Sequence, residues 1–123
     1  MVIAFANNLA MTAIKNTPCV IYTDPVPLNG MDRATMVWNI HSLWETSGGS
    51  ATVAYQGEFS NDGTNWLPIS GLLDSQTIAG VFGTPQVDVY GAFIRFKFTL
   101  TMSGVGGDIG GTVFDLHGSF DKA

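Results

Sequence analysis

Cysteine is almost absent from this sequence: Cys19 stands alone, so no disulfide can form within the chain. Long apolar runs are missing too, because no stretch approaches the about 20 apolar residues of a membrane-spanning helix. The N-terminus has neither the basic start nor the long apolar run of a secretory signal, and its first basic residue is Lys15. We therefore expect no signal peptide and no transmembrane segment, and the lone cysteine is compatible with synthesis in the cytosol.

Charged side chains are also scarce, at 12% of the residues against about 25% in ordinary soluble domains. The net charge is −5, and the basic side chains form no run. These five are Lys15, Arg33, Arg95, Lys97 and Lys122. Nucleic-acid binding needs a clustered basic surface that displaces counterions, and a membrane surface favours a basic amphipathic helix. The sequence has neither, so we exclude nucleic-acid binding as the main function and expect no membrane insertion.

The chain is hydrophobic at 46% of its residues, so few charges remain to keep a lone monomer soluble. One interpretation is that other subunits cover part of the surface, which makes the protein a homo-oligomer. The alternative is a small domain, rich in glycine and threonine, that neutral polar groups keep soluble. At 123 residues the chain has a size typical of one domain, with enough length for an independent core.

Alternating apolar and polar residues are the strongest structural signal in the sequence. Four segments show this period of two: Ala34–Glu45, Ala51–Ser60, Ala92–Met102 and Thr112–Phe120. Glycine-rich turns separate the segments, including Ser103–Gly111, and no stretch has a convincing helical period. The pattern predicts an all-β fold, a single antiparallel β-sandwich or jelly-roll-like domain.

A β-hairpin is predicted around the turn formers that follow Ser60. Asn61, Asp62 and Gly63 form the turn, since glycine accepts positive φ and aspartate tolerates it. The chain is expected to return through residues 64–66, which places Trp66 on the second arm of the hairpin as a core tryptophan.

Residues 1–17 are apolar but poorly patterned, so we predict an N-terminal arm there and a β-sandwich domain over residues 18–123. The arm would extend over its own domain or over a neighbouring subunit. Its large apolar side chains are the candidates for subunit contacts: Val2, Ile3, Phe5, Leu9, Met11 and Ile14. The pair Asn7-Asn8 interrupts the apolar run.

The residues that could carry chemistry have simpler roles. His41 and His117 are the only histidines, and neither has a cysteine or acid at zinc-ligand spacing on its face. Asp115 lies two residues before His117, yet no serine nucleophile or G-x-S-x-G motif accompanies them. Glu58 and Asp62 are better explained as a solvated strand residue and a turn former than as paired catalytic acids. Asn61 and Asp62 are better explained as turn residues than as calcium ligands, because the run lacks the repeated acidic positions of strong binding. We therefore expect no enzyme activity, no metal and no cofactor.

Aromatic side chains could instead form a platform for sugars. Trp38, Trp44 and Tyr55 fall on predicted inward faces, which favours packing in the core. The positions of Trp66 and Tyr90 stay open. An exposed Trp66 would favour a sugar-binding surface.

Three stretches together resemble the small β-sandwich proteins of phage and virus particles. They read Y-Q-G-E-F-S-N-D-G-T-N-W-L-P-I, then G-A-F-I-R-F-K-F-T-L-T, then S-G-V-G-G-D-I-G-G-T-V-F-D-L-H-G. In those proteins an S-N-D-G-x-N-W hairpin precedes a strand with an arginine and a glycine-rich turn into the last strand. A weaker similarity links the hairpin to discoidin-type domains and carbohydrate-binding modules, although this chain lacks the discoidin cysteines.

The resemblance implies a non-enzymatic structural protein of a virion or similar ordered particle, such as a capsid, decoration, head- or tail-associated subunit. It implies copies of itself and other particle proteins as partners, and a location in the virion after synthesis in the host cytoplasm. The alternative function is a carbohydrate-binding or adhesion module, whose partner would be a glycan.

Overall fold

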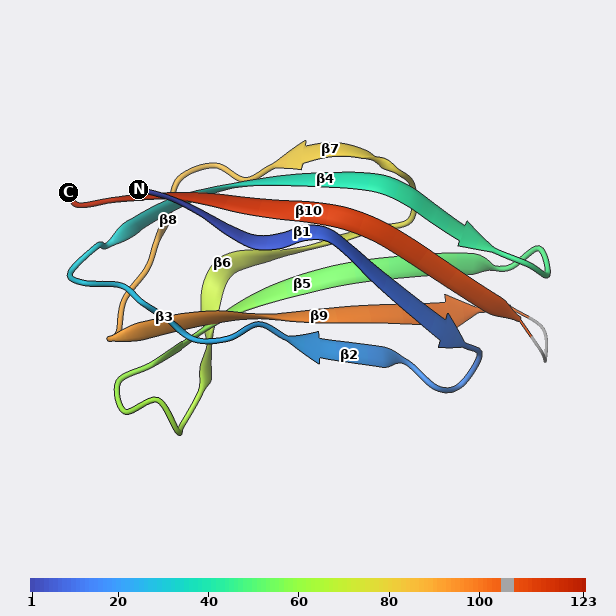
Figure 1. The fold of residues 1–123 in the computed structure, drawn as a ribbon, viewed down its shortest axis with the longest axis horizontal. Coiled ribbons are helices and arrows are strands. Elements are labelled where there is room, and N and C mark those ends of the chain that lie inside the picture. The colour runs from blue at the N-terminus through green and yellow to red at the C-terminus, as the bar shows by residue number, and fades with distance from the viewer. Residues whose placement is uncertain (105–107) are drawn as a thin grey trace.

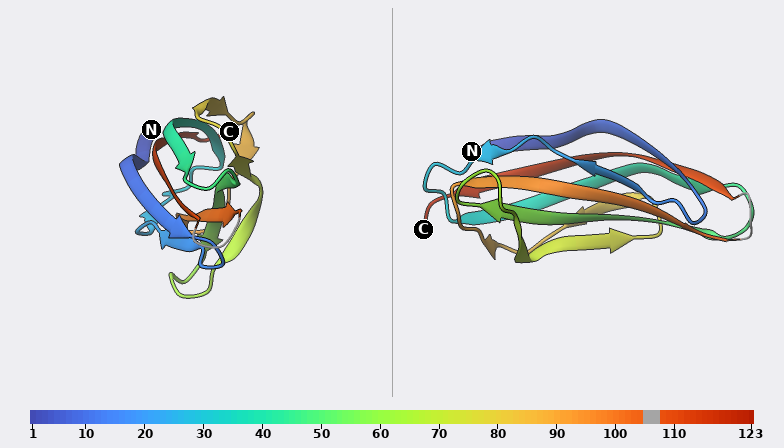
Figure 2. Two further views of the ribbon diagram at one scale, coloured as in Figure 1. Left: turned by 90° about the vertical axis from the view of Figure 1, so that its right-hand side faces the viewer. Right: turned by 90° about the horizontal axis from the view of Figure 1, so that it is seen from below.

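Two antiparallel β-sheets lie face to face in the computed structural model, which describes residues 1–104 and 108–123 (Figure 1). The longer strands run along the longest axis of the molecule, and the two layers are visible end-on (Figure 2, left). The strands are β1 (Val2–Ile14), β2 (Cys19–Tyr22), β3 (Val26–Pro27), β4 (Arg33–Glu45), β5 (Ser50–Ser60), β6 (Leu67–Gln76), β7 (Gly80–Gly83), β8 (Val87–Asp88), β9 (Phe93–Ser103) and β10 (Ile109–Asp121). The predicted antiparallel β-sandwich is confirmed.

The first sheet has the strand order β1-β10-β4-β7, with β8 also paired to β4. The second sheet has the order β2-β9-β5-β6, with β3 also paired to β9. Within the described residues no helix is long and apolar enough to cross a membrane. The glycine-rich turn predicted over Ser103–Gly111 includes residues 105–107, which lie outside the described residues.

The core lies between the sheets and follows from the alternation in the sequence. On β9, Ile94, Phe96 and Phe98 are fully buried, while Arg95 and Lys97 point to the outer face. Aromatic rings from both sheets meet edge to face across this core. The ring centroids of Trp38 and Tyr55 are 4.9 Å apart, and those of Phe98 and Phe114 are 5.0 Å apart.

Residues 2–14, predicted as an arm, form strand β1 of the chain's own first sheet, where they pair with β10. Two register irregularities interrupt this pairing, one between Ala4 and Ala6 and one between Ala6 and Leu9. Asn8 lies in the second irregularity with a φ of 51°, and its N–H donates a hydrogen bond to Asp115 Oδ1 over 2.6 Å. The irregularities explain why the segment has no regular alternation and does not read as a strand in the sequence.

Strand β4 contains a bulge that corrects one predicted inward position. Ile40 pairs with Phe114 and Ser42 pairs with Val113, so β4 carries one extra residue, His41, at this point. One extra residue inverts the alternation that follows. Leu43 therefore packs against the core, and Trp44, predicted to face inward, is 45% exposed.

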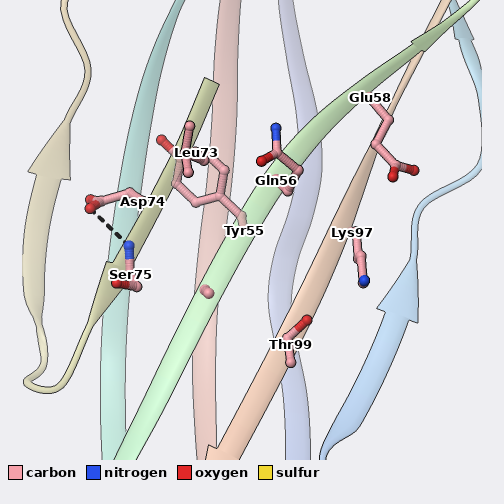
Figure 3. A pocket seen from close by; sticks show the side chains of 9 residues that line it. Tyr55, Gln56, Glu58, Leu73, Asp74, Ser75, Lys97 and Thr99 are labelled. Carbon is pink, nitrogen blue, oxygen red and sulfur yellow. Dashed lines mark hydrogen bonds between the residues drawn. The ribbon is translucent and has the colours of Figure 1, made fainter. Parts of the chain in front are cut away.

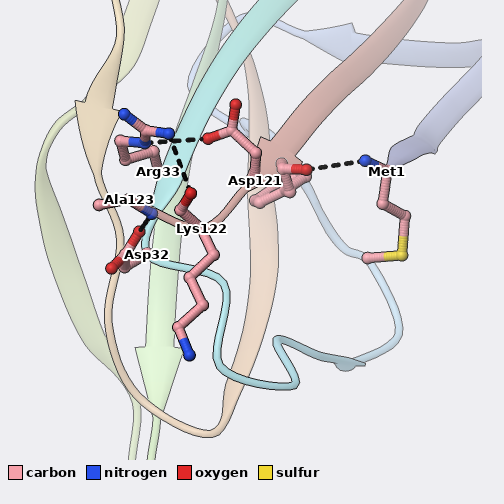
Figure 4. Close-up of polar contacts among 7 residues, drawn as sticks. Met1, Asp32, Arg33, Asp121, Lys122 and Ala123 are labelled. Carbon is pink, nitrogen blue, oxygen red and sulfur yellow. Dashed lines mark hydrogen bonds and ion pairs between the residues drawn. The ribbon is translucent and has the colours of Figure 1, made fainter.

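The two chain ends lie at the same end of the sandwich, held by polar contacts (Figure 4). The N-terminal ammonium of Met1 donates a hydrogen bond to the Phe120 carbonyl oxygen over 2.8 Å. Arg33 Nε forms an ion pair with Asp121 Oδ1 at 3.0 Å, and its Nη2 donates to the Lys122 carbonyl oxygen. These contacts hold β10 against its neighbours up to its last residues.

Candidate functional site

A groove of about 560 Å³ lies on the outer face of the second sheet, over β5, β6 and β9 (Figure 3). It is lined by Ala54, Tyr55, Gln56, Glu58, Leu73, Asp74, Ser75, Lys97 and Thr99. A volume of this size is within the range of small-molecule sites, about 300–1,000 Å³. We therefore treat this groove as the candidate binding site.

Two neighbouring rows of cross-strand pairs build the groove. One row runs Tyr22–Lys97–Gln56–Leu73 across β2, β9, β5 and β6. The next row runs Val20–Thr99–Ala54–Ser75 across the same strands. Residues opposite one another in antiparallel strands project from the same face. Small side chains in the second row leave a hollow beside the longer side chains of the first.

The hydrogen-bonding groups of the groove are only partly occupied. The Gln56 side-chain nitrogen donates to the carbonyl oxygens of Gly57, at 2.8 Å, and Ile69, at 3.1 Å, which fixes the amide against β6. Its oxygen, the Lys97 ammonium and the Thr99 hydroxyl make no hydrogen bond to the described part of the chain. These groups are available to a bound molecule.

Arg95 holds two aromatic rings beside the groove. Its guanidinium carbon lies 4.4 Å from the ring centroid of Tyr22 and 4.4 Å from that of Trp66. Its Nε donates to Glu58 Oε1 over 2.8 Å, which orients the guanidinium between the rings. Cation–π contacts of this kind contribute about 0.5–2 kcal/mol each, depending on exposure. The arrangement keeps Tyr22, which is 47% exposed, in a fixed orientation at the sheet surface.

Tyr55 also borders the groove, although its side chain points into the core, where its ring packs against that of Trp38 (Figure 3). Burial raises the pKa of Tyr55 well above its ordinary value, and the negative charge of Asp74 raises it further. The phenol therefore keeps its proton at neutral pH and remains a hydrogen-bond donor.

The predicted hairpin turn is present, but its return strand begins at Leu67 rather than at residue 64. Asp62 Oδ1 accepts hydrogen bonds from the backbone N–H groups of Thr64 and Asn65, each over 2.8 Å. The Ser60 hydroxyl donates to the same oxygen over 2.9 Å. This network holds residues 61–65 as a wide turn instead of extending the strand.

Trp66 follows the turn and lies outside the core, where it is half-buried against Arg95. The core tryptophan expected on the hairpin is therefore corrected to a surface tryptophan. The reason is the wide turn, which delays the start of β6 and brings Trp66 over the outer face of the sheet.

The histidines lie on the other sheet, His41 on β4 and His117 on β10. His41 Nε2 is 2.9 Å from Asp115 Oδ2, so the bulge residue of β4 pairs with the acid on β10. The pKa of Asp115 is lowered mainly by the hydrogen bond from the backbone N–H of Asn8. The hydrogen bond with the His41 side chain lowers it further. Within residues 1–104 and 108–123, no three His, Cys, Asp or Glu side chains are grouped to hold a metal ion.

The N-terminal candidates for subunit contact separate into two groups. Met11 is 2% exposed, and Ile3, Phe5 and Leu9 pack against the core of their own chain. Met11 therefore contributes to its own sandwich, whereas Ile3, Phe5 and Leu9 are only partly buried there and keep some surface exposed. Val2 and Ile14 remain 73% and 52% exposed.

The groove itself did not stand out in the sequence. Gln56, Lys97 and Thr99 alternate outward on their strands, a pattern that also fits ordinary solvated positions. Their assembly into one site depends on which strands pair and in which register, and β5 and β9 are separated by more than 30 residues in the chain.

No protein-family model matches the sequence, and no curated protein matches it. The fold is similar to that of solved structures from phage and virus sources. The chain aligns over 100% of its length with PBSX exported protein XepA, at a TM-score of 0.64 and 10% identity. It aligns over 100% of its length with the structure of infectious bursal disease virus Gx strain, at a TM-score of 0.56 and 10% identity.

T=1 particles derived from infectious bursal virus give a similar match, with 99% of this chain covered, a TM-score of 0.58 and 11% identity. The chain spans about a third of each of these proteins: 37% of XepA, 33% of the Gx strain chain and 31% of the T=1 particle chain. At this identity the likeness establishes a shared β-sandwich fold.

Proposed function

We propose that this chain is a non-enzymatic structural subunit that assembles with copies of itself, and with other particle proteins, into a virion or a similar ordered particle. The observation that carries the proposal is the whole-chain likeness to a protein that forms T=1 particles. The likeness to a PBSX exported protein supports the same phage or virus setting.

The surface of the sandwich supports assembly independently of that likeness. Ile14 and Ile109 face one another across the β1–β10 pair, and they are 52% and 45% exposed. Soluble monomers rarely expose contiguous apolar patches, and such patches commonly mark contact surfaces between proteins. About half of each side chain is still exposed, so burying it between subunits contributes on the order of half of the about 1.5–3 kcal/mol for complete burial, before ordering entropy is subtracted.

The subunit acts as a capsid, decoration, head- or tail-associated protein, made in the host cytoplasm and located in the virion. Its acidic net charge of −5 and dispersed basic residues are unsuited to holding the packaged nucleic acid directly. Its contacts are therefore with protein neighbours.

Sedimentation velocity over a range of concentrations, with negative-stain electron microscopy of the fastest fraction, tests the proposal. We expect a concentration-dependent species larger than the monomer. The double variant Ile14→Thr/Ile109→Thr keeps β-propensity but removes apolar area, so it should shift this species toward the monomer with little change in melting temperature. Val81→Thr, a matched exposed position on edge strand β7, is the control.

A chain that stays monomeric at every concentration, and that is absent from particles purified from its source, would overturn the proposal. If Val81→Thr dissociates the assembly and the isoleucine variant does not, the contact lies at the β7 edge instead.

A further inference from the structure

We propose that the groove on the outer face of the second sheet binds a neutral oligosaccharide. Lys97, Thr99 and Ser75 would supply hydrogen bonds to its hydroxyl groups, and the ring of Tyr22 would pack against a sugar face. This binding site goes beyond the assembly role, since it involves a different surface from the exposed Ile14–Ile109 pair.

The donors and acceptors of the groove match a ligand rich in hydroxyl groups. A sugar hydroxyl both donates and accepts, so it needs mixed partners at short spacing. The Lys97 ammonium donates, the Gln56 side-chain oxygen accepts, and the hydroxyls of Thr99 and Ser75 do both. Lys97 and Gln56 lie in one cross-strand row and Thr99 and Ser75 in the next, which gathers the four side chains on one face of β9, β5 and β6.

Tyr22 on the neighbouring strand β2 offers a preformed aromatic surface beside the residues that line the groove. Tyr22 is directly opposite Lys97 in the sheet, and it projects from the same face. Arg95 contacts one face of its ring, and Glu58 and Trp66 hold Arg95 in place. A ring held in this way loses little conformational entropy on binding, which favours even a weak stacking contact.

The local charges favour a neutral ligand over an anionic one. Glu58 neutralises Arg95 through their 2.8 Å ion pair. Lys97 and Asp74 bring one charge of each sign to the groove lining. The sum is close to zero, so sulfated or phosphorylated glycans gain no net electrostatic attraction here.

The hollow is polar and open, which also fits a shallow surface filled by water, or a groove for an extended peptide. A peptide would gain its main-chain hydrogen bonds by adding to the free edge of β6, beside the groove rather than within it. The side-chain hydroxyls of the groove floor would contribute nothing to that mode, which makes Thr99 the discriminating residue.

A glycan array carrying neutral, sialylated and sulfated oligosaccharides is the first probe for the full-length chain. We expect the array to show binding to one class of neutral oligosaccharides. Titration calorimetry with the sugar that binds best on the array should then give a Kd in the millimolar range or below. The matched variants are Thr99→Val and Thr101→Val. Both replace an outward threonine on β9, but only Thr99 lines the groove.

Thr99→Val should weaken binding by about tenfold, because one hydrogen bond is lost and a ligand hydroxyl stays unpaired. Thr101→Val should leave binding unchanged. Lys97→Gln should weaken binding by a similar factor, and Lys122→Gln should not. Melting curves of all four variants confirm that each folds, and Thr99→Ser, which keeps the hydroxyl, should restore binding.

Absence of binding to every array sugar at millimolar concentration would overturn the proposal, and so would equal effects of Thr99→Val and Thr101→Val. Selective binding of sulfated sugars that Lys97→Gln abolishes would overturn the neutral class. None of these outcomes bears on particle assembly, which sedimentation measures separately.

Discussion

At the scale of single residues, Asp62 shows how one side chain shapes a whole turn. The backbone N–H groups of Asn65 and Thr64, followed by the side chains of Asn65 and Ser60, lower the pKa of Asp62. The carboxylate thus accepts hydrogen bonds from backbone N–H groups that do not take part in the pairing of β5 with β6. As a result Trp66 lies on the surface with Arg95, and the sandwich gains an aromatic edge beside its groove.

Gly63 should be sensitive to any side chain, although the space around it is open. Its φ of 77° is in the left-handed region, and an added Cβ would find only Phe93 within 4 Å, at 3.9 Å. Gly63→Ala should lower the free energy of unfolding by about 1–2 kcal/mol through backbone strain, and Gly63→Asn should lower it less. Urea denaturation measures the difference. Gly83→Ala, where no positive φ occurs, is the control and should change stability by about 0.5 kcal/mol or less.

Trp38 and Trp66 should respond differently to truncation, since only Trp38 lies in the core. Trp38→Ala should cost about 3–5 kcal/mol in unfolding free energy, and Trp66→Ala about 1–2 kcal/mol. The buried indole N–H of Trp38 has no hydrogen-bond partner in the described residues, so Trp38→Phe removes no hydrogen bond. Trp38→Phe should therefore cost less than Trp38→Ala. Similar losses for both alanine variants would place Trp66 in the core after all.

At the scale of elements, the bulged strands decide which side chains reach the core. The second irregularity of β1 contains Asn8, and the single extra residue of β4 is His41. Asp115 on β10 lies between them and accepts a hydrogen bond from Asn8 while pairing with His41. One acid thus stabilises both irregular strands against the central strand of their sheet.

Removing β1 should prevent folding rather than release an accessory arm. Deletion of residues 2–16 leaves one edge of β10 unpaired and removes Phe5 and Met11 from the core. We expect the truncated chain to show no cooperative thermal transition by circular dichroism and no dispersed amide spectrum. The full-length Ile14→Thr/Ile109→Thr variant, which keeps the pairing, should melt cooperatively. A truncated chain with a native transition would make β1 dispensable to the sandwich.

At the scale of the whole molecule, burial in the aromatic core changes the titration of the Tyr55 phenol. The Tyr55 side chain is 3% exposed and packs against Trp38 in the core. In the unfolded chain this phenol ionises near pH 10, and in the folded chain its raised pKa keeps it neutral to higher pH.

The raised pKa of Tyr55 predicts a loss of stability at alkaline pH. The folded state binds the proton more tightly, so the stabilisation is fully present below about pH 10 and is lost as the pH rises toward the folded pKa. Unfolding free energies measured from neutral to alkaline pH should fall less steeply for Tyr55→Phe than for the wild type. Tyr22→Phe, which removes an exposed hydroxyl, is the control for the general alkaline effect. Parallel curves for wild type and Tyr55→Phe would contradict the prediction.

The sequence alone determined the fold class and most of the core. Period-two alternation in β5 and β9 correctly assigned four side chains to the inside: Val53, Tyr55, Phe96 and Phe98. The reason is that successive side chains of a strand point to opposite faces of its sheet, and one face of each sheet is buried in the core. The turn at Asp62 and Gly63 was equally local, since it depends on backbone φ and on side chains within a few residues.

Only the tertiary structure decided the features that depend on pairing. Extra residues at Asn8 and His41 can be located only against a partner strand, so β1 read as an arm and Trp44 as a core residue. The groove likewise needs the register that aligns Thr99 with Ala54 and Ser75. Alternation fixes a face of one strand, but long-range pairing sets which faces become neighbours, and no local pattern in the sequence contains that register.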